Sequence, residues 1–282
     1  MAARSLFQRK AVDLMVKIIS TASASIGILA LVWILITVIG KGYRAINFDF
    51  FTRIPTPPGI TGGGLVNAMV GTILITALAA LIAVPIGILG GIFLSEFGKG
   101  SKLADFVRFL TNVLIGVPSI IVGVFIYSLM VVPLKTFSGY AGAASLAVIM
   151  LPIVIRTTED ILNLVPDSLR ESALAMGASR RQTVFDVIFK AAKNGLITGV
   201  LLAVARVSGE TAPLLFTALN SPYWFKSLSE PIANLTVTIF NYAMSPYPDW
   251  QQQAWGASLL ITVGILLLNI FIRVMFRTRR YQ

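Results

Sequence analysis

Long apolar segments alternate with shorter polar segments along the whole chain. Six apolar segments are predicted to be membrane-spanning helices, since each approaches the length that crosses about 30 Å of hydrocarbon at 1.5 Å per residue. Pro85, Pro118 and Pro152 lie inside three of them. This pattern predicts an all-α fold, a polytopic membrane protein with six transmembrane helices. The predicted spans are residues 18–39, 65–94, 106–132, 141–155, 196–219 and 257–275.

The composition agrees with a membrane protein and excludes several other classes. Of the 282 residues, 56% are hydrophobic and 12% are charged, whereas a soluble domain carries about 25% charged residues. This balance excludes a disordered chain, a coiled coil, a secreted disulfide scaffold and a soluble multidomain enzyme. The chain has neither Cys nor His. Thiol chemistry, Cys/His zinc sites and histidine acid–base catalysis are therefore excluded, and an integral membrane enzyme is a weak alternative.

The basic residues are concentrated on one side of the predicted membrane. The formal net charge is +11, from 23 Lys and Arg against 12 Asp and Glu. If both termini are cytoplasmic, 17 of the 23 basic residues fall in or beside cytoplasmic segments, as the positive-inside rule requires. We therefore expect a multi-pass protein of the plasma (inner) membrane with both termini in the cytoplasm. The net positive charge follows from this orientation in the lipid bilayer and implies no nucleic-acid partner.

The sequence predicts two parts in the chain. Residues 1–64 would hold a cytoplasmic N-terminus, the first transmembrane helix and an external loop. Residues 65–282 would hold five transmembrane helices and a long cytoplasmic loop at 156–195. The first apolar segment exceeds the roughly 7–15 residues of a cleaved signal peptide, so we expect an uncleaved helix. The external glycines 62–64 could cradle an anion with their backbone N–H groups, but a flexible connector is the simpler interpretation.

The long cytoplasmic loop carries clear helix boundaries. Pro166 is expected to break the end of the fourth span, and apolar spacing predicts a short helix over residues 168–176. Gly177 is placed as its C′ residue, where glycine adopts a positive φ most easily. Ser179 and Gln182 form a capping box for a second helix.

We expect the second helix of this loop to end at Asn194 and Gly195, before the fifth span begins. Three interpretations of the loop are open: a plain surface loop, a DNA-binding helix–turn–helix, or a docking element for a cytoplasmic partner. DNA binding is implausible for a segment held between two membrane spans. Ordered loops of this length usually have a function, which favours docking.

A charged pair falls inside the fifth predicted span. Arg206 and Glu210 are four residues apart and would share one helix face. A single charge at a helix centre costs about 2.5–3.5 kcal/mol. One interpretation is a mutual ion pair that only stabilises the bundle. The other is an anion path, in which the Arg206 fork contacts the anion while Glu210 orients it. Ser208 and Thr211 add small polar groups, and Pro213 frees a backbone carbonyl.

A second charged group lies at the inner end of the fourth span. Arg156, Thr157 and Glu159 follow its last apolar residues. The spacing favours a local ion pair between Arg156 and Glu159, with the arginine as a positive-inside anchor. Alternatively, the group forms an inner-end path that helps release an anion into the cytoplasm.

The cytoplasmic loop contains the motif of a known family. Glu171, Ser172 and Ala173, followed by Gly177, resemble the EAA…G loop of ABC importer permeases. In that family the helix before the glycine is the coupling helix, which sits in a groove of a separate ATPase subunit. The resemblance implies that Glu171, Ala173 and Gly177 couple this chain to an ATPase. Ser172 replaces the first alanine of the motif, and Lys190 replaces the proline at its end.

Further segments narrow the resemblance. The run from Ala205 to Leu215 resembles the R-x-x-GETAPL segment of the PstA family of phosphate-importer permeases, and segments 116–121 and 151–171 resemble other parts of that family. The sister family PstC shares Gly-Glu-Thr but usually lacks the following Ala-Pro-Leu. The resemblance implies an ABC importer permease fold over residues 65–282. The substrate path would then contain Arg206, Ser208, Glu210 and Thr211.

The resemblance implies a transporter subunit and not an enzyme. It would form the translocation path with a PstC-like permease, be driven by a PstB-like ATPase dimer, and receive phosphate from a PstS-like phosphate-binding protein. The chain has no P-loop, so we expect no cofactor on it, with ATP and Mg²⁺ on the partner ATPase. The alternatives are a permease for another oxyanion, such as sulfate or molybdate, and an ion-driven secondary transporter.

Overall fold

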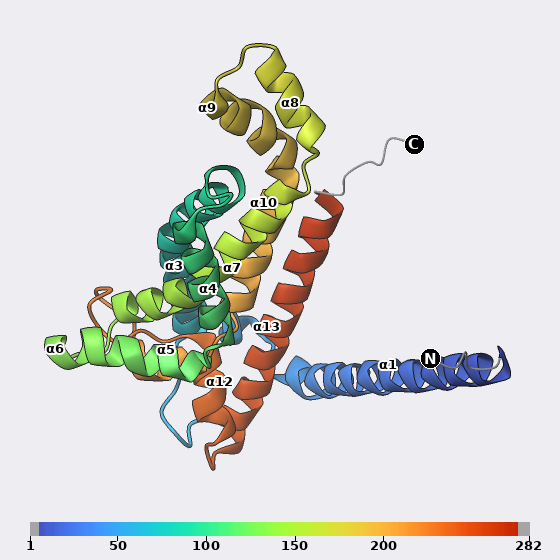
Figure 1. Cartoon of the computed structure of the whole chain (residues 1–282). Coiled ribbons are helices and arrows are strands. Elements are labelled where there is room, and N and C mark those ends of the chain that lie inside the picture. The colour runs from blue at the N-terminus through green and yellow to red at the C-terminus, as the bar shows by residue number, and fades with distance from the viewer. Residues whose placement is uncertain (1–5, 276–282) are drawn as a thin grey trace.

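The protein is a helical bundle with one helix standing away from it (Figure 1). The computed structural model describes residues 6–275, and every regular element in that range is helical. Five helices are long and apolar enough to cross a membrane, or six if one bent pair counts as a single span. The predicted all-α membrane fold is confirmed. The basic residues Arg4, Arg277, Arg279 and Arg280 lie outside the described residues.

The long helices form the frame of the molecule. They are α1 (Leu6–Gly42), α3 (Val66–Ile92), α7 (Gly139–Asn163), α10 (Phe189–Val207) and α13 (Pro248–Met275). The shorter helices are α2 (Phe48–Thr52), α4 (Lys102–Gly116), α5 (Ser119–Ile126), α6 (Val132–Leu134), α8 (Asp167–Ala175), α9 (Arg180–Gln182), α11 (Ala212–Thr217) and α12 (Leu235–Ala243). Phe93–Phe97, Tyr127–Val131 and Thr183–Ile188 are π-helical turns, and Tyr43–Ala45 is a 3-10 turn.

The core lies where α3 and α7 cross at close range. Gly87 faces Val154, and a Cβ added to the glycine would lie 2.7 Å from the Val154 Cβ. Met150 and Leu146 are fully buried in the same cluster. Because glycine has no side chain at this crossing, the two backbones approach more closely than larger residues allow, so α3 and α7 pack tightly.

Helix α1 leaves the bundle near α13 and points away from it (Figure 1). Its packing on α13 is confined to its end, where Gly42 abuts Leu259 and the Lys41 ammonium lies 4.8 Å from the centre of the Trp255 ring. None of its most apolar stretch is buried. The predicted first span is therefore a single helix, and its apolar surface is open to lipid or to another chain.

The third predicted span is wrong as a single straight helix. Helices α4 and α5 meet at 102°, and α5 and α6 run across the bundle (Figure 1). The bend falls at Val117 and Pro118, whose ψ angles of 129° and 133° are extended. Proline disfavours the α conformation in the residue before it and removes a backbone donor, so the helix ends there.

The fifth predicted span is wrong at both ends. The helix does not stop at Asn194 and Gly195 but runs without a break from Arg180, through the π-helical turn, to Val207. Gly195 serves close packing, because a Cβ there would lie 2.9 Å from a methyl carbon of Ile161 on α7. After Val207 the helix is interrupted at residues 208–211, and α11 follows.

Other boundaries also differ from the predicted ones. Helix α7 continues to Asn163 instead of ending at 155, so the segment outside the long helices is shorter than 156–195. Helix α13 begins at Pro248, nine residues before the predicted 257. Helix α12 was not predicted.

Candidate functional sites

Helix α8 has the boundaries that the sequence predicts. It ends before Gly177, which has φ +84° and donates to the Leu174 carbonyl at 2.9 Å. Ala178 donates to the Ala173 carbonyl at 3.1 Å, so the last carbonyls of the helix are paired. The predicted capping box is also confirmed, with Ser179 and Gln182 bonded to each other's backbone.

The outer surface of α8 carries exposed apolar side chains among polar ones. Met176 is 88% exposed and Leu174 is 51% exposed, and Glu171 beside them is also exposed. Ala173 is half-buried. Helix α8 lies at one end of the molecule, beyond the long helices (Figure 1). Exposed apolar side chains gathered at one tip are typical of a surface that binds another protein.

The inner end of α7 carries the predicted ion pair, but with an additional partner. Arg156 Nη1 lies 3.8 Å from Glu159 Oε2, which confirms the pairing of these two residues. Glu159 also accepts from Arg108 Nε of α4 at 2.7 Å, and it is 4% exposed. Thr157 instead packs on Gly199 of α10. Thr157 and Glu159 therefore contact different neighbours. The partner of Glu159 on α4, Arg108, was missed by the sequence analysis.

The predicted Arg206–Glu210 pair does not form. Helix α10 ends at Val207, so the two residues do not share a helix face. Within residues 6–275, Arg206 forms no ion pair, and its side chain is exposed. The backbone carbonyl of Glu210 accepts from Thr236 Oγ1 of α12 at 2.9 Å.

The small polar residues beside Arg206 lie in the same break. Ser208 Oγ donates to the Ala205 carbonyl at 2.8 Å, and Thr211 precedes α11 as its N-cap residue. An exposed guanidinium therefore lies next to a non-helical turn, whose backbone N–H groups at residues 208–210 donate to carbonyls of the preceding helical turn. This arrangement can bind an anion at the surface of the chain, provided that another surface closes over it.

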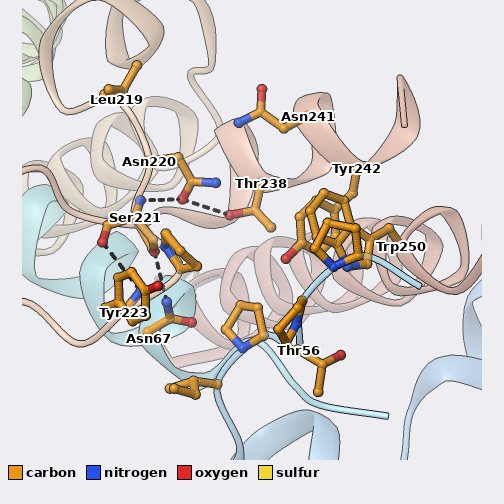
Figure 2. Close-up of a pocket in the computed structure, with 16 residues that line it drawn as sticks. Thr56, Asn67, Leu219, Asn220, Ser221, Tyr223, Thr238, Asn241, Tyr242 and Trp250 are labelled. Atoms are coloured by element: carbon orange, nitrogen blue, oxygen red, sulfur yellow. Dashed lines mark hydrogen bonds between the residues drawn. The ribbon is translucent and has the colours of Figure 1, made fainter. Parts of the chain in front are cut away.

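A pocket of about 630 Å³ (Figure 2) lies beside α12, at the opposite end of the molecule from α8 (Figure 1). Its walls come from residues 54–58, residues 219–223, α12 and the start of α13, and none of its lining side chains is charged. Tyr242 stacks on Trp250 with ring centres 4.4 Å apart, and burial raises the pKa of Tyr242 to about 12. The pocket is therefore neutral and offers no counter-charge to an anion.

These features together define a class of protein. Membrane-length helices, a break beside an exposed arginine, and an exposed helix with apolar side chains at one tip fit a membrane transport subunit. The family described as "Binding-protein-dependent transport system inner membrane component" matches residues 83–280. The chain belongs to this family of transport permeases, and the predicted ABC importer permease fold is confirmed.

The chain is also similar to curated proteins over nearly its full length. It is 47% identical to the phosphate transport system permease protein PstA of Yersinia pestis, over 94% of this chain and 90% of that protein. It is 49% identical to PstA of Haemophilus influenzae, over 93% of both chains. The predicted resemblance to the PstA family is thus confirmed.

Solved structures of ABC transporters share the fold. A chain of the MetNI methionine transporter in an inward-facing conformation matches with a TM-score of 0.64 and 21% identity, over 76% of this chain and 94% of that chain. A chain of a bacterial alginate transporter matches with a TM-score of 0.63 and 15% identity, over 97% and 98%. At these identities the likeness concerns the fold alone.

Proposed function

We propose that this chain is the permease subunit of an ATP-driven importer of inorganic phosphate. The similarity to PstA permeases over more than 90% of the chain carries the proposal. The exposed Arg206 beside a helix break supports it, because a guanidinium fork suits a phosphate oxyanion. The chain moves its substrate without catalysing a reaction, and ATP hydrolysis belongs to a partner.

The proposed partners follow from the similarity to PstA permeases. A PstB-like ATPase dimer would receive α8, with Glu171, Ala173 and Gly177 in the contact, and would hold ATP and Mg²⁺. A PstC-like permease would complete the path, and a PstS-like phosphate-binding protein would deliver the anion at the opposite end. The α8 end would face the cytoplasm, with both termini on that side of the plasma (inner) membrane.

The substrate path would lie between the two permeases. Arg206, Ser208, Glu210 and Thr211 gather at the break after α10, where this chain leaves Arg206 uncovered. The second permease would supply the facing wall and exclude water. Arg156, Thr157 and Glu159 would lie nearer the cytoplasmic exit. The core over residues 65–282 would carry this path, and residues 1–64 would add the separate first helix.

Purification from membranes tests the class of transporter. The chain should co-purify with an ATPase subunit and a second permease. Phosphate uptake should stop when the ATPase is absent, and it should continue when an ionophore collapses the proton gradient. The opposite pattern would identify an ion-driven secondary transporter and overturn the proposal.

Uptake competition tests the substrate. In a strain lacking this chain and complemented with it, unlabelled phosphate should suppress uptake of labelled phosphate, whereas sulfate and molybdate should not. Stronger competition by sulfate or molybdate would assign the permease to that oxyanion.

A further inference from the structure

Arg170 differs from the other charged residues of α8 because its side chain turns back into the body of the protein. Only 13% of this side chain is exposed. Its Nη2 atom lies 2.7 Å from Glu96 Oε1, and its Nε atom lies 3.3 Å from Glu96 Oε2. Glu96 belongs to the π-helical turn that extends α3, and its side chain is 7% exposed. The hydrogen bond to Glu96 raises the pKa of Arg170 above its ordinary value.

The same guanidinium also holds the end of α7. It donates to the carbonyl oxygen of Leu162 at 2.9 Å and to that of Val165. The last carbonyls of a helix have no partner within the helix. Arg170 therefore pairs carbonyls at the end of α7 while it binds the carboxylate at the end of α3, and a planar fork with five donors suits this double role.

Arg180, which follows α8, holds the same end of α3. Its Nη2 atom donates to the backbone carbonyl of Glu96 at 2.7 Å, and its guanidinium lies 5.2 Å from the centre of the Phe97 ring. Thus one residue of α8 and the first residue of α9 contact the end of α3. We call Glu96, Arg170 and Arg180 the α8 clamp.

The burial of the clamp separates it from ordinary surface ion pairs. Lys190 and Asp186 also form an ion pair in this region, at 3.2 Å, but their side chains are 68% and 60% exposed. Such an exposed pair is screened by water and salt and contributes little. The Glu96–Arg170 pair is shielded from water and bonded on several sides, so removing one partner leaves a buried charge without its counter-charge.

We propose that Arg170 is a positioning residue that fixes α8 to the ends of α3 and α7, so that these three helices move as one body. This role of Arg170 rests on the proposed function, in which a partner ATPase displaces α8. A displacement of α8 would then pass directly to α3 and α7, which are already tightly packed against each other. Without the clamp, α8 would move on its flexible connections and leave the membrane helices behind.

Transport stoichiometry in the purified complex tests the proposal. Arg170→Gln and Glu96→Gln should each keep the ATPase bound but raise the ATP hydrolysed per phosphate transported by at least about threefold, within the roughly 2- to 30-fold range that mutations along a coupling network produce. The double variant should be no worse than either single variant, because both remove the same contact. Arg170→Lys, which keeps the charge without the fork, should give an intermediate value.

The matched control is Lys190→Gln, which removes the exposed pair and should leave the stoichiometry unchanged. Three outcomes would overturn the proposal: unchanged stoichiometry in both single variants, additive losses in the double variant, or loss of the bound ATPase in proportion to lost uptake. The last outcome would reduce Arg170 to a purely structural role.

A second measurement does not depend on transport. The chain has no cysteine, so Lys99→Cys and Ser168→Cys place two spin labels at exposed positions on either side of the clamp. The distance distribution between the labels should be narrow and should broaden with Arg170→Gln but not with Lys190→Gln. No broadening would overturn the clamp. A narrow distribution that broadens as expected, in a complex that fails to import phosphate, would instead overturn the proposed function alone.

Discussion

Only part of the environment of Arg206 could be predicted from the sequence. Its place among small polar residues was predicted, but its pairing with Glu210 was wrong, because a spacing of four residues brings side chains together only if the helix continues. Instead Arg206 lies in the last turn of α10. The negative end of the helix dipole there stabilises a cation by about 0.3–1 kcal/mol. The helix end therefore partly offsets the cost of the charge and leaves the fork open to an anion.

We predict that Arg206→Gln reduces phosphate uptake to background while the complex still assembles, because the amide lacks the charge that binds the anion. Arg206→Lys should keep a part of the uptake. Labelled phosphate uptake and co-purification of the ATPase are the measurements. Arg273→Gln is the matched control, since Arg273 is also exposed and also lies in the last turn of a long helix. Normal uptake by Arg206→Gln would remove this residue from the path.

At the scale of elements, local signals were predictable and distant contacts were not. The end of α8 at Gly177 and the capping box after it depend on residues a few positions apart, and both were predicted correctly. Gly195 was misinterpreted as a helix end. The glycine makes room for Ile161, which lies on another helix, and the local sequence does not show this contact. Glu96 was missed for the same reason, since its partner Arg170 is 74 residues away in the sequence.

We predict that Gly177→Val weakens binding of the ATPase. A left-handed backbone costs an L-residue roughly 1–2 kcal/mol, and nothing lies within 4 Å of the glycine to add a steric cost. The end of α8 should therefore change shape while the bundle stays intact. Gly100→Val is the control, since Gly100 also has a positive φ and open surroundings but lies between α3 and α4. Equal co-purification of the ATPase with both variants would contradict the coupling role of Gly177.

We predict that Gly87→Val destabilises the bundle by about 1–3 kcal/mol, the usual cost of overpacking. The new side chain would overlap Val154 at the crossing of α3 and α7. The thermal unfolding temperature of the purified protein in detergent is the measurement. Gly27→Val in α1 meets nothing within 4 Å and should cause no loss. Equal unfolding temperatures for the two variants would show that the crossing tolerates a larger residue.

At the scale of the whole molecule, the bundle forms its core without α1. The buried clusters are built from residues beyond α1, and α1 contacts α13 near its C-terminal end, at Lys41 and Gly42. The number of apolar segments was predictable from the sequence. The directions of α1 and of the α4–α5 pair were not, because apolarity gives the length of a helix but not its orientation.

We predict that a chain without residues 1–40 still folds into the bundle. Its unfolding temperature should shift by less than about 4 °C, the change expected for 1 kcal/mol in a domain of this size. Circular dichroism in detergent measures the transition. Deletion of residues 248–282 is the comparison, because it removes α13, whose Ala257 and Leu259 are buried. Loss of a cooperative transition on removing residues 1–40 would show that α1 is part of the core.

The contact of α10 with α7 has a mechanical consequence. Helix α10 has 19 residues and is therefore about 28 Å long. It rests on α7 at Gly195 and Gly199, where Ile161 and Thr157 fill the space left by the missing side chains. These contacts lie in the middle third of the helix, and Arg206 lies at its far end. Beyond them, Ala203 and Val207 of α10 are buried in the same cluster as Met150 and Val154 of α7, so a movement of α7 would carry the whole of α10, and Arg206 with it.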